Sequence, residues 1–100
     1  MVKYKRRDKN TDDIVEAIEE CGFEAIDCHN MGGGFPDKIA VKKIGQHWCS
    51  VPIEIKGIYG KLTESQNKFE DEFPGLNHVC RTKEDAKAVL RKYERIFNAG

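Results

Sequence analysis

The chain has 100 residues with 17 basic and 17 acidic side chains, so its formal net charge is zero with histidine neutral. This length suits one small domain, expected over residues 1–100, that buries roughly 60–70% of the surface its unfolded chain exposes. The sequence has no long apolar run and no apolar segment behind its charged N-terminus. We therefore expect no membrane span, no secretory signal and a cytoplasmic location.

The four cysteines include no Cys-x-x-Cys pair, which argues against a ribbon-type zinc site and against a disulfide framework. A His/Cys metal site built from Cys28-His29 and His47-x-Cys49 also lacks the usual ligand spacing. We therefore expect reduced cysteines that pack as small apolar side chains.

The first predicted element is a helix that ends at Gly22, because glycine is common just after a helix. Asn10 or Thr11 would cap its start, and the two aspartates that follow would meet the positive end of the helix dipole. Apolar side chains recur at helical spacing along it and give one apolar face: Ile14, Val15, Ile18 and Cys21.

Three strands are predicted next, over residues 23–29, 37–44 and 47–56, because apolar and polar side chains alternate there. Proline removes a ladder hydrogen bond, so Pro52 predicts a kink or bulge just before Glu54. A lone tryptophan in a strand usually packs, so Trp48 is expected in the core or in a dimer interface rather than as a platform for base stacking.

The last third of the chain predicts a helix from Thr63 that ends at Pro74-Gly75, a short edge strand over residues 77–81, and a helix from Thr82 to Phe97. The complete order is helix, strand, strand, strand, helix, strand, helix. This order predicts an α/β domain with a mixed central sheet flanked by helices.

Two acidic side chains and a lysine form the candidate site. Glu54 and Lys56 are two apart on a predicted strand, so they project from the same face. If the second and third strands pair through the short turn near residues 44–46, Asp37 comes beside Glu54 on that face. Carboxylates are hard oxygen ligands suited to Mg²⁺ or Mn²⁺, and the lysine offers positive charge to a phosphate or an attacking hydroxide.

These residues resemble a known nuclease signature. Pro36-Asp37 with Glu54-Ile55-Lys56 is similar to the PD-(D/E)XK motif, and with Gly33-Gly34-Phe35 and Lys61-Leu62-Thr63-x-x-Gln66 it resembles the VRR-NUC domain. It is most similar to the short stand-alone domains of bacteriophages, which are related to Holliday-junction resolvases. The resemblance extends from about residue 6 to residue 90, and it implies a restriction-endonuclease-like core and an endonuclease that depends on Mg²⁺ or Mn²⁺.

The resemblance also implies partners and a place of action. Such enzymes cut branched or flapped DNA, Holliday junctions among them, and usually act as homodimers because two strands must be cut. A phage-encoded member acts in the cytoplasm of the host cell. We therefore expect DNA as the substrate and a second copy of the chain as a partner.

The resemblance assigns metal ligands residue by residue. Asp37, Glu54 and the backbone carbonyl of Ile55 would bind the metal, and Asp13 matches an acidic residue of the first helix that reaches the site in relatives. The alternative for Asp13 is a helix acid that only complements the dipole.

The resemblance likewise gives Lys56 and Gln66 catalytic roles. Lys56 would orient a water or stabilise charge on the phosphate, and Gln66 would act beside it. However, Thr63-x-x-Gln66 also fits a capping box, in which the glutamine side chain reaches back to the amide of the cap residue. The sequence leaves these two interpretations of Gln66 in competition.

DNA affinity would come from basic side chains that neutralise phosphates, although a net charge of zero is low for such a protein. Acidic residues concentrate on predicted helices, at 16–20 and 64–72, which leaves the basic ones segregated. The three glycines before Phe35, Gly32-Gly33-Gly34, form a glycine loop that would let a DNA backbone approach Asp37, or would form a plain connector. The residues expected at DNA are Arg6, Arg7, Gly33, Gly34, Lys42, Lys43 and Lys61.

Two other functions stay open from the sequence. The first is a non-catalytic DNA-binding or accessory module on a nuclease scaffold, which the neutral charge and Pro52 favour and the intact acids and lysine disfavour. The second is an interaction protein in which the motif is a coincidence. Incubation with nicked, flapped and four-way DNA and Mg²⁺ or Mn²⁺ discriminates among the three.

Overall fold

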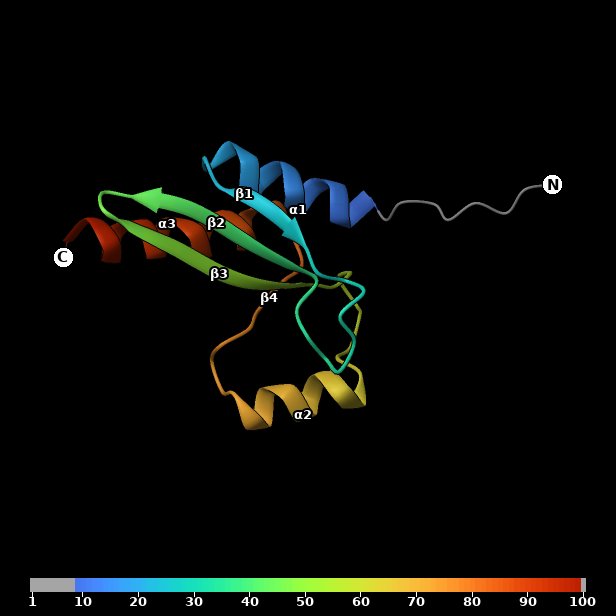
Figure 1. Cartoon of the computed structure of the whole chain (residues 1–100). Helices are drawn as coiled ribbons and strands as arrows, with labels where there is room; N and C mark the ends of the chain where they lie inside the picture. The colour runs from blue at the N-terminus through green and yellow to red at the C-terminus, as the bar shows by residue number, and fades with distance from the viewer. Residues whose placement is uncertain (1–8, 100) are drawn as a thin grey trace.

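The computed structural model describes residues 9–99, and their helices and strands follow the order predicted from the sequence (Figure 1). The elements are α1 (Lys9–Glu20), β1 (Glu24–Asp27), β2 (Lys38–Ile44), β3 (His47–Ile55), α2 (Glu64–Glu72), β4 (His78–Cys80) and α3 (Lys83–Ala99). The sheet has the order β1-β2-β3-β4, with antiparallel pairing up to β3 and β4 parallel to β3. The predicted α/β class with a mixed sheet is confirmed. Within residues 9–99, no helix has the length and apolar character needed to cross a membrane.

A two-residue turn sets the register of β2 and β3. Ile44 pairs with His47, and Gly45 between them has φ +63°, a conformation that glycine adopts without steric penalty. Glycine at the first position of such a turn gives a twist that matches the flanking strands. The register that follows pairs Lys38 with Ile53, so the start of β2 lies beside the end of β3.

The core lies between one face of the sheet and the helices α1 and α3. Along β3, Cys49, Val51 and Ile53 are buried, and the side chains between them are more exposed. Each fully buried isoleucine or leucine contributes about 1.5–3 kcal/mol. The buried cluster joins β3 to apolar side chains of both helices: Ile14, Ala17, Ile18, Ala86 and Leu90.

The face of the sheet opposite α1 and α3 corrects the expectation for Trp48. Trp48 is 66% exposed because it is one residue from Cys49 and therefore projects from the other side of β3. A place in the core was a wrong prediction, and a dimer interface stays a prediction. Helix α2 stands apart from α1 and α3 in Figure 1, and none of its residues is buried.

Strand β3 runs in continuous register through Pro52, contrary to the predicted kink or bulge. The N–H of Lys56 donates to the carbonyl of Cys80 in β4. Along a strand, the backbone N–H and C=O groups of every second residue point toward the same neighbouring strand. Pro52 therefore turns its nitrogen to the β4 side, and the pairing of β4 begins only opposite Ile53. Proline is tolerated here because its nitrogen, which has no hydrogen to donate, faces the β4 side at a point before β4 begins.

Candidate active site

Asp37 and Glu54 face each other across the ends of β2 and β3. Asp37 directly precedes Lys38, which pairs with Ile53, so the register places Asp37 across from Glu54. Its Oδ2 also accepts a hydrogen bond of 2.9 Å from the backbone N–H of Ile55. This bond fixes the Asp37 carboxylate against β3, and the structure thus brings together the two acids that the sequence placed on one face.

Glu54 is a buried carboxyl group with a raised pKa. It is 1% exposed, and burial, followed by the hydrogen bonding and charge of Asp37, raises its pKa to about 8, whereas Lys56 and Gln66 oppose the rise. The Oε1 atom of Glu54 has no hydrogen-bond partner among residues 9–99. An ionised Asp37 offers acceptor oxygens and no donor, so the pair needs either a shared proton or a cation.

Lys56 extends over the same acid. Its Nζ lies 3.9 Å from Glu54 Oε2, and its side chain is largely shielded from solvent. The backbone of Lys56 is held from two sides, because its N–H donates to Cys80 and its carbonyl accepts from Asn10 Nδ2. Helix α1 begins at Lys9, so Asn10 lies inside it and not at the predicted cap. No sequence pattern predicts this contact, which fixes the start of α1 next to the candidate site.

Gln66 makes both contacts between which the sequence left a choice. Its Oε1 accepts from the Thr63 N–H at 2.8 Å and its own N–H donates to Thr63 Oγ1 at 3.2 Å, which completes a capping box at the start of α2. Its Nε2 donates to Glu54 Oε2 at 2.7 Å. The two roles do not compete, because an amide carries its acceptor and its donors on different atoms.

The glycine loop holds α2 next to these acids. Gly34 has φ +79°, and a Cβ built there would lie 2.2 Å from the backbone oxygen of Ser65. The close backbone approach that glycine permits is therefore made to α2. Gly33 is exposed and has open space at its Cβ position. The ring of Phe35 packs edge-on against Phe69, with the ring centroids 6.0 Å apart, so the loop anchors the helix that carries Gln66.

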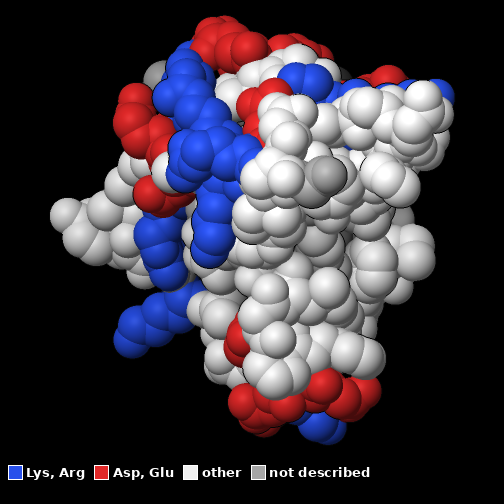
Figure 2. All heavy atoms as spheres, turned by 90° about the vertical axis from the view of Figure 1, so that its left-hand side faces the viewer, with Lys and Arg blue, Asp and Glu red and all other residues white. Residues whose placement is uncertain are grey.

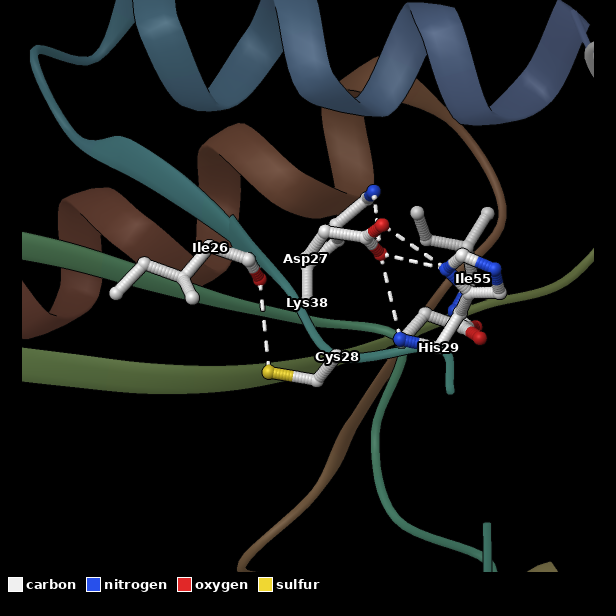
Figure 3. Close-up of polar contacts among 7 residues, drawn as sticks. Ile26, Asp27, Cys28, His29, Lys38 and Ile55 are labelled. Atoms are coloured by element: carbon white, nitrogen blue, oxygen red, sulfur yellow. Dashed lines mark hydrogen bonds and ion pairs between the residues drawn. The ribbon is translucent and has the colours of Figure 1, made fainter. Parts of the chain in front are cut away.

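A polar cluster joins the end of β1 to the start of β2, and one of its members, Lys38, directly follows Asp37 (Figure 3). Asp27 accepts hydrogen bonds from the backbone N–H of His29 and from Lys38 Nζ at 3.1 Å, and its Oδ2 lies 2.9 Å from His29 Nδ1. The bonds from His29 and then from Lys38 lower the pKa of Asp27. Lys38 is thereby occupied in an ion pair, so its charge holds the sheet edge.

The structure also bears on two further predicted site residues, Asp13 and Lys42. Among residues 9–99, no three His, Cys, Asp or Glu side chains form a group that could hold a metal, so Asp13 does not complete such a group with the two acids. Lys42 belongs to the contact between β2 and the helices, where its Nζ bonds Glu94 Oε2 at 2.6 Å and the Cys21 carbonyl at 3.1 Å. The structure thus places Lys42 in packing between elements and not beside the motif.

The other basic residues predicted at DNA are not all near the motif. Lys43 is exposed six residues from Asp37, about 20 Å along the strand. Lys61 is exposed in the segment before α2, and Arg6 and Arg7 lie outside the described residues. Figure 2 shows a continuous band of Lys and Arg on the end of the molecule where the β2–β3 turn lies. That end is the far end of this strand pair from the two acids.

No match was found when the chain was compared with protein-family models, with curated proteins and with solved structures. The resemblance of the motif to VRR-NUC nucleases therefore stays a prediction. The basis for inferring a function is the geometry of Asp37, Glu54, Lys56 and Gln66.

Proposed function

We propose that this protein is a divalent-cation-dependent hydrolase of DNA phosphodiester bonds. The observation that carries the proposal is the pairing of Asp37 with buried Glu54, whose Oε1 has no partner among residues 9–99 and whose pKa is raised to about 8. A buried polar atom without a partner destabilises a fold, and such groups concentrate where a ligand or a reaction needs them.

A divalent cation fits this acid pair. Two carboxylates and the neighbouring backbone carbonyl of Ile55 are hard oxygen ligands, which Mg²⁺ and Mn²⁺ prefer. Mg²⁺ is usually held through one or two carboxylates and several waters, so a third acidic side chain is not required. Asp37, Glu54 and Ile55 would hold the ion. A cation bound in this way makes a water easier to deprotonate and offsets negative charge on a phosphate.

The surrounding side chains position the acids and complement a phosphate. Gln66 holds Glu54 Oε2 through its 2.7 Å bond, which leaves Oε1 as the oxygen available to a ligand. The Ile55 N–H holds Asp37 Oδ2 in the same way. Lys56 Nζ, 3.9 Å from Glu54 Oε2, supplies positive charge that stabilises negative charge as it develops on phosphate oxygens.

The finer parts of the proposal are branched or flapped DNA as the substrate, a homodimeric enzyme and action in the cytoplasm, and they rest on the motif resemblance. The net charge of zero and the ion pairs of Lys38 and Lys42 support recognition of DNA shape with a limited number of phosphate contacts.

The proposal is tested by incubating the protein with nicked, flapped, four-way and linear duplex DNA in Mg²⁺, Mn²⁺ or EDTA. We expect cleavage with either cation, faster on the branched substrates, and none in EDTA. Binding of DNA without cleavage under all these conditions would instead support the non-catalytic accessory module. Neither binding nor cleavage would reject a nucleic-acid function.

The variant Gln66→Glu separates the two roles of this side chain. The new carboxylate still accepts from the Thr63 N–H, so α2 stays capped, but it cannot donate to Glu54 and adds a like charge beside it. We expect the cleavage rate to fall by about 10–100-fold, as for other residues that orient a metal ligand. Far-UV circular dichroism, which measures helix content, should be unchanged.

Thr63→Ala is the matched control for this variant. It removes the Oγ1 acceptor from the helix cap and lowers stability by about 1 kcal/mol, but it keeps the bond from Gln66 to Glu54. Its cleavage rate should stay near that of the wild type. An equal loss of rate in the two variants would show that Gln66 acts only through the cap.

A further inference from the structure

We infer that the turn over residues 57–60 is a wedge that stacks on an unpaired nucleobase of branched DNA, an inference that rests on the function proposed above. The turn presents two adjacent large side chains, Ile58 and Tyr59, which are 59% and 93% exposed. Single exposed apolar residues are normal on protein surfaces. An aliphatic side chain and an aromatic one exposed side by side on one tight turn indicate an interaction surface.

Arg81 holds this turn in one shape. Its Nη1 donates to the carbonyls of Gly57 at 2.6 Å and Gly60 at 2.7 Å, and the Gly60 N–H closes the turn on the Gly57 carbonyl at 3.0 Å. The backbone N–H of Arg81 donates in turn to the carboxylate of Asp85 in α3 at 2.8 Å. Side chains on a turn fixed in this way lose less conformational freedom on binding, which favours contact with a ligand.

The turn lies against the lysine of the candidate site. It begins one residue after Lys56, and a Cβ built on Gly60 would lie 3.5 Å from Lys56 Cδ. In Figure 1 the chain leaves β3 for this turn at the end of the sheet where β2 begins, which is the end that carries Asp37. A DNA strand whose phosphate reaches Lys56 therefore brings its neighbouring bases to Tyr59.

An unpaired base is the partner that fits this tip. A base that stacks on an aromatic side chain gains about 1–3 kcal/mol, and apolar wedges enter base steps that are opened. Continuous duplex hides the faces of its bases, whereas a branch point, flap or nick exposes them. Stacking tolerates any sequence and needs no large basic surface, which agrees with the net charge of zero. Tyr59 thus selects branched DNA over duplex.

Stacking is measured with 2-aminopurine at the branch point of a flapped DNA, with Ca²⁺ in place of Mg²⁺ so that the strand stays intact. The wild-type protein at saturation is expected to quench the fluorescence. Tyr59→Ala should lose the quenching, and it should fold because Tyr59 is 93% exposed. Tyr59→Phe keeps the ring and should quench fully. Trp48→Ala, which removes an exposed aromatic side chain at the far end of β3, should also quench fully.

Cleavage in Mg²⁺ gives the second readout. Tyr59→Ala should cut flapped DNA about 10–100-fold more slowly, from the loss of one stacked base, and linear duplex at an unchanged rate. If this variant quenches and cuts flapped DNA as the wild type does, the inference is overturned and the proposed hydrolase stands. If the wild type quenches in a Tyr59-dependent way but cuts no DNA, the hydrolase is rejected and the stacking wedge is supported.

Discussion

Glu54→Gln is expected to abolish cation-dependent cleavage and, at the same time, to stabilise the metal-free protein. The amide has nearly the shape of the acid, but it is a poor ligand for a hard cation and removes a buried charge beside Asp37. We expect the cleavage rate to fall by at least about 100-fold. In EDTA at alkaline pH, the free energy of unfolding measured with urea should rise by about 1–3 kcal/mol. A lower cleavage rate together with a higher free energy of unfolding would show that Glu54 is kept for function at a cost in stability.

Glu72→Gln is the matched control, because it removes the same charge from an exposed position of α2. Its unfolding free energy should stay within about 0.5 kcal/mol of the wild type, and its cleavage rate should not change. Asp37→Asn should lose cleavage as Glu54→Gln does. Cleavage at the wild-type rate by either acid variant would contradict the proposed site. A lower free energy of unfolding for Glu54→Gln would contradict the claim that the buried Glu54 charge destabilises the metal-free protein.

In EDTA, the free energy of unfolding is expected to fall as the pH rises from about 4.5 to about 8, the ordinary and the raised pKa of Glu54. Below the lower value the group is protonated in both the folded and the unfolded state. Between the two values the folded protein keeps a proton that the unfolded chain releases, so stability falls as the pH rises. Above the upper value Glu54 is ionised in the folded state too, and its stabilising contribution is lost. The slope is at most about 1.4 kcal/mol per pH unit.

Urea unfolding at a series of pH values measures this slope. Glu54→Gln should flatten it. Other shifted groups titrate outside the window, since burial raises the pKa of Cys80 to about 12 and the bonds from His29 and Lys38 lower that of Asp27. Saturating Mg²⁺ should also flatten the slope, because a bound cation takes the place of the proton. Wild-type stability that does not change across the window would show that Glu54 is not held protonated.

The elements of the fold could be predicted because their signals are local. Alternation along β3 and helical spacing in α1 and α3 follow from which side chains the core buries. The meeting of Asp37 and Glu54 was predictable for the same reason. A short turn at Gly45 fixes the pairing of the two strands that it joins, so the position of each acid relative to the turn determines its neighbour.

Features that depend on distant parts of the chain could not be predicted. Lys42 finds its partner Glu94 at a separation of 52 residues. The exposure of Trp48 depends on which face of the sheet the helices cover. Pro52 leaves the strand pairing intact because of where β4 starts. The sequence leaves two roles for Gln66 in competition because it does not show that the Oε1 and Nε2 atoms contact different partners.

Helix α2 buries none of its residues, yet it carries the amide that holds Glu54. Its attachment depends on the glycine loop and on the ring contact between Phe35 and Phe69, and not on the cluster that holds the sheet together. Opening of this helix is therefore a local equilibrium with a smaller free energy than global unfolding. The protein can lose and regain its functional arrangement while its sheet remains intact, so thermal stability and competence for catalysis are separately adjustable properties of this chain.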